Sequence, residues 1–241
     1  MKNLKRAIKR MRGWGGKWDG RRELFRGLFH SSAGLAAWFL LQIVGVSLAT
    51  VGWLLFTIGP IVWVLDWYRV KVVNVKREGQ RFVLSQWLAQ YLFRETEKNR
   101  PSNVLVSLSG LGLAWVVCTL VDAPWIAAGT GLIFATVDPC AKFGMYWPIK
   151  VIAWGPARGK SWGGFLSGLG AGLIATTLIV LLPREQFPLL PATVSPIFAY
   201  LILAIATVVA SWAELISGKY DNLLIPTSAA LTMSLLVSVG G

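Results

Sequence analysis

Residues 33–67 read AGLAAWFLLQIVGVSLATVGWLLFTIGPIVWVLDW, and the first 33 of them include no Asp, Glu, Lys or Arg. As one helix this stretch would be about 52 Å long, whereas the hydrocarbon core of a bilayer is only about 30 Å thick. One ordinary membrane span therefore does not account for it. We expect two short helices, with a break near residues 46–50 and a kink at Gly59-Pro60 in the second.

Similar apolar runs follow along the chain. They predict further spans at about residues 104–120, 123–138, 163–182, 192–214 and 222–239. Hydrophobic residues make up 55% of the 241 residues and charged residues only 15%, a composition that soluble domains rarely have. The sequence predicts an all-α fold, a polytopic transmembrane helix bundle of about seven spans.

The distribution of basic residues supports the break within residues 33–67. If the N-terminus and residues 68–102, 139–161 and 215–221 lie on one side, that side carries 23 of the 24 Lys and Arg, and only Arg184 lies opposite. The positive-inside rule then makes this side cytoplasmic. A single helix over residues 33–67 would move ten basic residues to the other side. The prediction is a cytoplasmic N-terminus and a C-terminus on the opposite side.

The N-terminal segment differs in character from the rest of the chain. We expect residues 1–28 to form a basic cytoplasmic or interfacial arm and residues 29–241 to form the transmembrane domain. Leu4, Ile8, Met11 and Trp18 alternate with Lys and Arg in the arm, which is typical of an amphipathic helix on anionic lipid. The net charge of +13 could also indicate nucleic acid, but the basic groups flank predicted spans, so we expect no nucleic-acid partner.

Carboxylates stand at the predicted span ends on the cytoplasmic side. Asp66, Asp138 and Glu214 end three spans, and Asp221-Asn222 begins the last one. Ionisable groups at membrane depth are costly and usually functional. Carboxylates that converge among Lys and Arg suit a divalent metal together with a polyphosphate. The alternative is that each carboxylate caps a helix or faces water.

Two further segments could contact phosphate. Gly159-Lys160-Ser161 precedes a predicted span and could present backbone N–H groups and an ammonium, although it could equally be a loop before a glycine-rich packing face. His30 would share a helical face with Arg26. It could serve as a base or a phosphate donor, and a hydrogen-bonded structural histidine is the alternative.

In order and spacing these residues resemble the CTP-dependent lipid kinase family, which includes dolichol kinase, phytol kinase and a CTP-using diacylglycerol kinase. More distantly they resemble the CDP-diacylglycerol synthases. The resemblance covers roughly residues 23–230. The matching blocks are Glu23, Arg26, His30 and Gly34; Asp66 and Arg69; Arg94, Glu95 and Glu97; Asp138, Ala141 and Gly144; Gly159, Lys160, Ser161 and Gly164; and Glu214 with Asp221, Asn222 and Pro226. Gly27, Val137 and Gly163 stand where the family has Lys, Gly and Glu.

The resemblance implies transfer of a phosphoryl group from CTP, with Mg²⁺, to a membrane lipid alcohol such as a polyprenol, phytol or diacylglycerol. It implies catalytic roles for His30, Asp66, Asp138 and Glu214, and metal binding by Asp138, Asp221 and Glu214. Nucleotide or phosphate contacts are implied for Arg26, Arg69, Gly144, Gly159, Lys160, Ser161, Gly164 and Asn222. One alternative is a cytidylyltransferase that makes a CDP-lipid. The other is a non-catalytic relative, which the missing carboxylate at Gly163 would suit.

Overall fold

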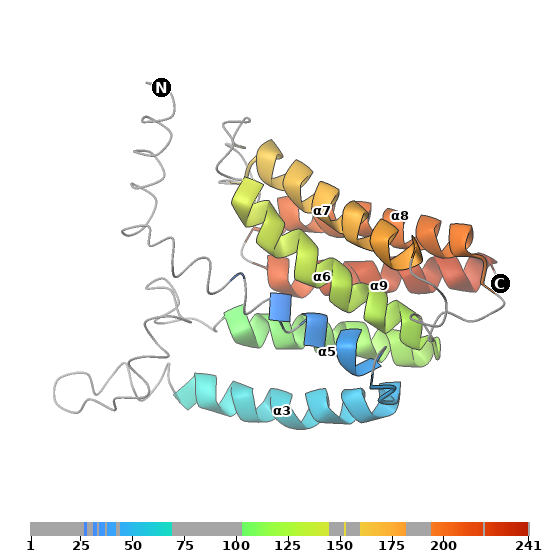
Figure 1. The fold of residues 1–241 in the computed structure, drawn as a ribbon. Coiled ribbons are helices and arrows are strands. Elements are labelled where there is room, and N and C mark those ends of the chain that lie inside the picture. Colours follow the sequence, from blue (N-terminus) through green and yellow to red (C-terminus); the bar gives the residue numbers. More distant parts are fainter. Residues whose placement is uncertain are drawn as a thin grey trace, which may run out of the picture.

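The computed structural model describes residues 27, 31–32, 34–36, 38–41, 44–68, 103–144, 152, 160–181, 194–218 and 220–240. The labelled helices are α3 (Leu48–Tyr68), α5 (Asn103–Leu120), α6 (Pro124–Gly144), α7 (Trp162–Leu181), α8 (Pro196–Ile216) and α9 (Asp221–Gly240). Described helical residues between 27 and 41 precede them. The helices lie side by side as a bundle (Figure 1), and the described residues form no β-sheet.

The predicted break within residues 33–67 is confirmed. Helical residues reach Leu41, Gly45 has a φ of +69°, and α3 begins at Leu48. The Oγ of Ser47 accepts a hydrogen bond of 3.1 Å from the backbone N–H of Thr50, so Ser47 caps the N-terminus of α3. The predicted kink stays a prediction, since α3 runs as one helix from Leu48 to Tyr68 with Pro60 inside it.

Gly45 allows a first test of this break. Its φ lies in the left-handed region, yet a side chain there would meet nothing within 4 Å. We therefore expect Gly45→Ala to lower the free energy of unfolding by about 1 kcal/mol through backbone strain alone. Gly59→Ala is the matched control, because Gly59 also faces open space but is helical, so alanine there should be neutral or stabilising. Equal thermal shifts of the two purified variants in detergent would contradict this explanation.

Within the described residues four helices, α3, α7, α8 and α9, are long and apolar enough to cross a membrane, and Leu105–Leu120 of α5 is a shorter apolar helix. Their outward side chains fit this environment, since large apolar residues such as Trp53, Trp63, Leu178 and Ile197 are exposed. The chain is therefore a helical membrane protein, as predicted.

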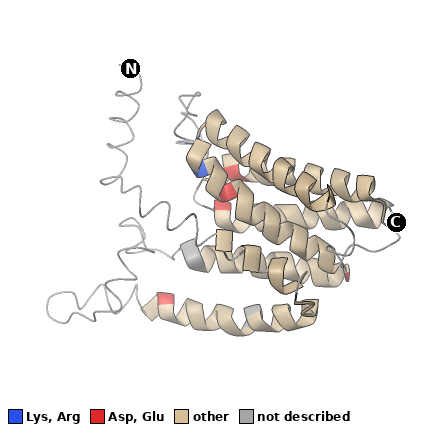
Figure 2. Cartoon of the chain, viewed as in Figure 1, with Lys and Arg blue, Asp and Glu red and all other residues tan. Residues whose placement is uncertain are grey.

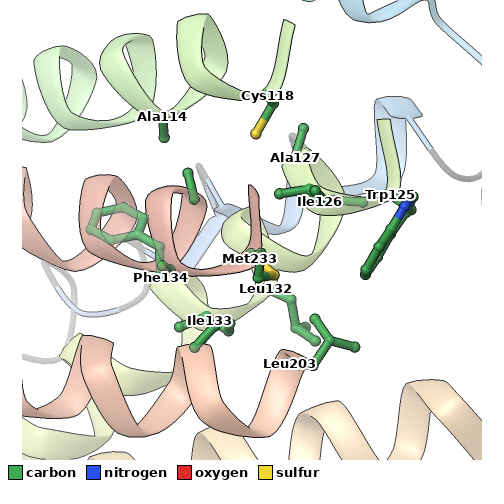
Figure 3. Close-up of a cluster of buried hydrophobic side chains, with 14 of the residues drawn as sticks. Ala114, Cys118, Trp125, Ile126, Ala127, Leu132, Ile133, Phe134, Leu203 and Met233 are labelled. Atoms are coloured by element: carbon green, nitrogen blue, oxygen red, sulfur yellow. The ribbon is translucent and has the colours of Figure 1, made fainter. Parts of the chain in front are cut away.

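Helix α6 occupies the middle of the bundle. Of its 21 residues 16 are buried, and it packs against α5, α7, α8 and α9. Figure 3 shows its side chains Ile126, Ile133 and Phe134 near Met233 of α9 and Leu203 of α8. Because protein rather than lipid surrounds α6, this helix can carry charged residues that a lipid-facing helix could not.

Candidate functional site

Charged side chains gather at one end of the bundle. Figure 2 shows the red and blue segments at the end where α6 and α8 finish and α9 begins. Of the charged residues that the structure describes, only Asp122, in the turn between α5 and α6, lies at the other end of the bundle. The structure thus brings the predicted carboxylates of several spans to one end.

Lys160 joins two of these carboxylates. Its ammonium donates a hydrogen bond to Oε1 of Glu214, near the end of α8, and one of 3.0 Å to Oδ2 of Asp221, the first residue of α9. The three side chains are largely buried, with exposed fractions of 15%, 5% and 16% for Lys160, Glu214 and Asp221. Gly218, with a φ of +61°, lies in the short connection that brings α9 back beside the end of α8.

A second ion pair lies nearby on α6. The Lys142 ammonium donates to Oδ2 of Asp138, whose side chain is fully buried, and Lys142 is the more exposed partner. The charge of Asp138 also acts on Lys160. Lys160, Glu214, Asp221, Asp138 and Lys142 are called the Lys160 cluster below. The sequence interpretation missed Lys142, although its spacing of four residues from Asp138 on one helix predicts such a pair.

Local structure fixes the backbone at Lys160 and at the residue that follows it. The carbonyl of Lys160 accepts a 2.8 Å hydrogen bond from the backbone N–H of Ile152. The next residue, Ser161, caps α7, since its Oγ accepts a 3.0 Å hydrogen bond from the backbone N–H of Gly164. Ser161 and Gly164 therefore have a structural role here, and their phosphate contacts stay predictions.

Gly144, also predicted at the nucleotide site, lies where α6 meets α7. A Cβ at this position would come within 2.2 Å of the carbonyl oxygen of Gly163 and 2.4 Å of the Oγ of Ser167. Only glycine allows this approach of the two helices. The close contact gives Gly144 a packing role that brings the end of α6, with Asp138, beside the start of α7.

The charges around Lys160 decide its protonation state. Burial lowers the pKa of the Lys160 ammonium, but the negative charges of Asp221 and Glu214 outweigh burial and hold that pKa above its ordinary value. Lys160 is therefore charged throughout the physiological pH range. It can attract anions and donate hydrogen bonds, but it cannot serve as a base.

Asn222 lies next to Asp221 at the start of α9. Only 1% of it is exposed, and neither its side-chain oxygen nor its side-chain nitrogen has a hydrogen-bond partner among the described residues. Its backbone N–H donates a 2.9 Å hydrogen bond to Oδ1 of Asp221. A buried polar group without a partner costs about 1–3 kcal/mol, so this amide is a candidate for contact with a ligand.

The donor chemistry of this end of the bundle suits Mg²⁺, which binds carboxylate and amide oxygens. The described residues nevertheless include no group of three or more His, Cys, Asp or Glu close enough to hold a metal ion. The Lys160 ammonium instead holds Glu214 and Asp221, two of the three predicted ligands. A metal at these carboxylates would have to replace Lys160 as their partner.

The remaining predicted residues are less closely tied to the Lys160 cluster. Asp66 is buried near the end of α3, a helix that packs mainly against α5. Arg26, His30, Arg69 and Gly159 lie outside the described residues, as does most of the N-terminal arm. Their roles stay predictions.

Two described residues of the N-terminal region pack on α6 near Asp138. The hydroxyl of Ser31 donates a 3.0 Å hydrogen bond to the carbonyl oxygen of Ala135. A Cβ at Gly27 would lie 3.9 Å from Cβ of Pro139. Gly27 and Ser31 therefore lie beside the turn of α6 that carries Asp138.

An aromatic group lies beside Lys160. Trp162 packs edge-on against Phe165 and against Trp212 of α8, with ring centroids 5.7 and 6.0 Å apart, and both tryptophans are partly exposed. Tryptophan is enriched where a membrane meets water. The position of these rings at the start of α7 fits the predicted membrane boundary near the Lys160 cluster.

Comparison of the chain with protein-family models, with curated protein sequences and with solved structures gives no match in any of the three.

Proposed function

We propose that this protein is a membrane-embedded phosphotransferase, which moves the γ-phosphoryl group of CTP to the hydroxyl group of a membrane lipid. The observation that carries the proposal is Lys160, a charged and largely buried side chain bonded to Glu214 and Asp221 from two further elements. Burying charges at the end of an apolar bundle is costly, and such charges are usually functional.

The cluster supplies groups that phosphoryl transfer needs. Catalysis of this reaction depends mostly on positioning and on stabilising the charge of the phosphate oxygens. In the proposal the ammonium groups of Lys160 and Lys142 bind these oxygens. Asp138, Asp221 and Glu214 would hold Mg²⁺, which would neutralise further charge on the triphosphate.

The lipid alcohol approaches from the bilayer. Its hydroxyl oxygen forms a bond to the γ-phosphorus while the bond from that phosphorus to the bridging oxygen breaks, so CDP leaves. The hydroxyl proton passes to a base, for which His30 and Asp66 are the predicted residues. By the distribution of Lys and Arg, the end with the Lys160 cluster faces the cytoplasm, where CTP is found.

A structural role in a non-catalytic membrane protein is the second candidate. It is favoured by the fact that Lys160 already neutralises Glu214 and Asp221, and that Gly163 has no side chain where the family has Glu. In that case the ion pairs only join α8, α9 and the segment before α7.

Label transfer tests the proposal. We expect the full-length protein in lipid micelles to transfer label from γ-labelled CTP, but not from α-labelled CTP, to one of a panel of polyprenol, phytol and diacylglycerol. Asp221→Asn should reduce the transfer at least about a hundredfold, because the substitution removes a charge from the cluster. Asp122→Asn, at the other end of the bundle, should leave the transfer unchanged.

Two other results of the labelling experiment would indicate different functions. Transfer of the α-label would identify a cytidylyltransferase. No labelled lipid with CTP, ATP, GTP or UTP and any alcohol of the panel, from a folded preparation, would contradict the proposed lipid phosphotransferase and favour the structural role.

A further inference from the structure

Helices α7 and α8 pack side by side, and a groove lies between them at the end of the bundle opposite the Lys160 cluster. The groove has a volume of about 340 Å³ and an almost wholly apolar surface. The described residues that line it come from the end of α7 and the start of α8, namely Thr177, Val180, Leu181, Pro196, Ile197 and Tyr200.

The length of α7 gives the depth of this groove in the membrane. The 20 residues of α7 span about 30 Å, which equals the thickness of the hydrocarbon core. Because α7 begins beside the Lys160 cluster, its last residue, Leu181, lies at the opposite boundary of the membrane. Thr177 lies about 6 Å further into the hydrocarbon. The groove therefore runs inward from the level at which the acyl chains of the opposite leaflet begin.

We propose that this groove binds one acyl chain of a glycerophospholipid from the leaflet opposite the Lys160 cluster. Both helices are long and apolar enough to cross a membrane, and Leu181 and Ile197 are exposed, so the groove faces hydrocarbon. The N-terminus of α8 lies at its mouth, and the partial positive charge there favours the phosphate of a lipid head group. The Tyr200 hydroxyl forms no hydrogen bond to the described residues and can donate to an ester carbonyl of the lipid.

The lining of the groove favours a lipid chain over a transmembrane helix of a partner. Helices that associate in membranes place small residues at their contacts. The contact between α7 and α8 is of this kind, since a Cβ at Gly172 would lie 2.5 Å from Cγ2 of Thr207. In the groove only Thr177 is small, and its hydroxyl donates a 2.7 Å hydrogen bond to the carbonyl oxygen of Leu173. A flexible chain fits between large side chains that hold a second helix away.

The depth of the groove also separates its occupant from a lipid held at the Lys160 cluster. From Ser161 to Thr177, α7 rises about 24 Å, well over half the thickness of the hydrocarbon core. A chain from the leaflet beside Lys160 would have to pass the middle of the membrane to enter the groove. The occupant is therefore a lipid of the opposite leaflet, and this inference does not depend on the proposed phosphoryl transfer.

Binding of phospholipid to the purified full-length protein tests the proposal. The protein is washed in a mild detergent, titrated with phosphatidylcholine that carries palmitoyl and oleoyl chains, and followed by native mass spectrometry. We expect the wild type to bind one phospholipid saturably. Val180→Trp, which fills the groove, should bind it at least about tenfold more weakly. Equal binding by both proteins would overturn the proposal.

Leu178→Trp is the matched control. Leu178 is an exposed residue of the same helix that does not line the groove, so this variant adds the same ring elsewhere on the surface. It should bind phospholipid like the wild type, and a loss equal to that of Val180→Trp would overturn the proposal. Ile197→Trp fills the groove from α8. Because Ile197 is exposed, this variant keeps the test open if Val180→Trp does not fold.

Photocrosslinking locates the bound chain. A phosphatidylcholine with a diazirine in the upper part of one acyl chain should label the end of α7 and the start of α8 in the wild type, and Val180→Trp should lose this labelling. Uniform labelling of all exposed helices would mean a general lipid layer and would overturn the proposal. So would a dimer that Val180→Trp dissociates, since the groove would then be a contact between two copies. These measurements need no nucleotide, so their failure is distinct from failure of the proposed function.

Discussion

Replacing Lys160 with methionine is expected to lower the free energy of unfolding by about 3–5 kcal/mol in the absence of divalent ions. The substitution keeps the apolar stem of the side chain but leaves the buried carboxylates of Glu214 and Asp221 without their shared cation. Thermal unfolding in detergent, followed by circular dichroism in the presence of a chelator, measures the effect. The same variant should also lose lipid phosphorylation at least about a hundredfold.

Lys142→Met gives the comparison for stability. Lys142 pairs with one carboxylate and its side chain is more exposed than that of Lys160, so solvent screens the pair and the loss should be smaller. If Lys160→Met unfolds at the wild-type temperature, the ion pairs seen around Lys160 contribute nothing and the site must be described differently.

Gly110→Ala should be a strongly damaging small change, although it adds only a methyl group and no charge. A Cβ at Gly110 on α5 would lie 2.5 Å from the carbonyl oxygen of Asn222 and 2.8 Å from Cα of Leu223, both backbone atoms of α9. The start of α9 must therefore move. We expect a loss of about 1–3 kcal/mol in the free energy of unfolding, together with weaker nucleotide binding, because Asp221 and Asn222 are displaced.

Gly112 provides a control on the same helix. A Cβ there would meet nothing within 4 Å, so Gly112→Ala adds the same methyl group and the same helix propensity without a clash. It should be neutral or stabilising. Similar unfolding temperatures and nucleotide affinities for the two variants would show that α5 and α9 are not in close contact at Gly110.

The positions of the spans could be predicted well because apolar runs and basic flanks are properties of the sequence itself. The break near Gly45 followed from the asymmetry of Lys and Arg, and α5, α7 and α9 begin and end close to the predicted residues. The predicted end of α6 at residue 138 was wrong, since α6 continues to Gly144. Asp138, which was expected at the end of the span, is buried inside the bundle and pairs with Lys142 one turn further along the same helix.

For the candidate site, the sequence predicted which residues come together but not how they contact one another. The sequence placed Asp138, Glu214 and Asp221 on one face, and the structure brings them to Lys160. It could not show that the Lys160 ammonium contacts both Glu214 and Asp221, because this depends on how close three separate elements pack. Tight contacts such as that of Gly144 with Gly163 set those distances.

The central claim is that the Lys160 cluster binds a nucleotide and is not only a structural ion network. Calorimetric titration of the purified protein with CTP and Mg²⁺ tests it most directly, with Asp138→Asn compared against Asp122→Asn. We predict saturable binding to the wild type and to Asp122→Asn, and binding at least about tenfold weaker to Asp138→Asn. No binding to the wild type, or equal affinity in both variants, would contradict the claim.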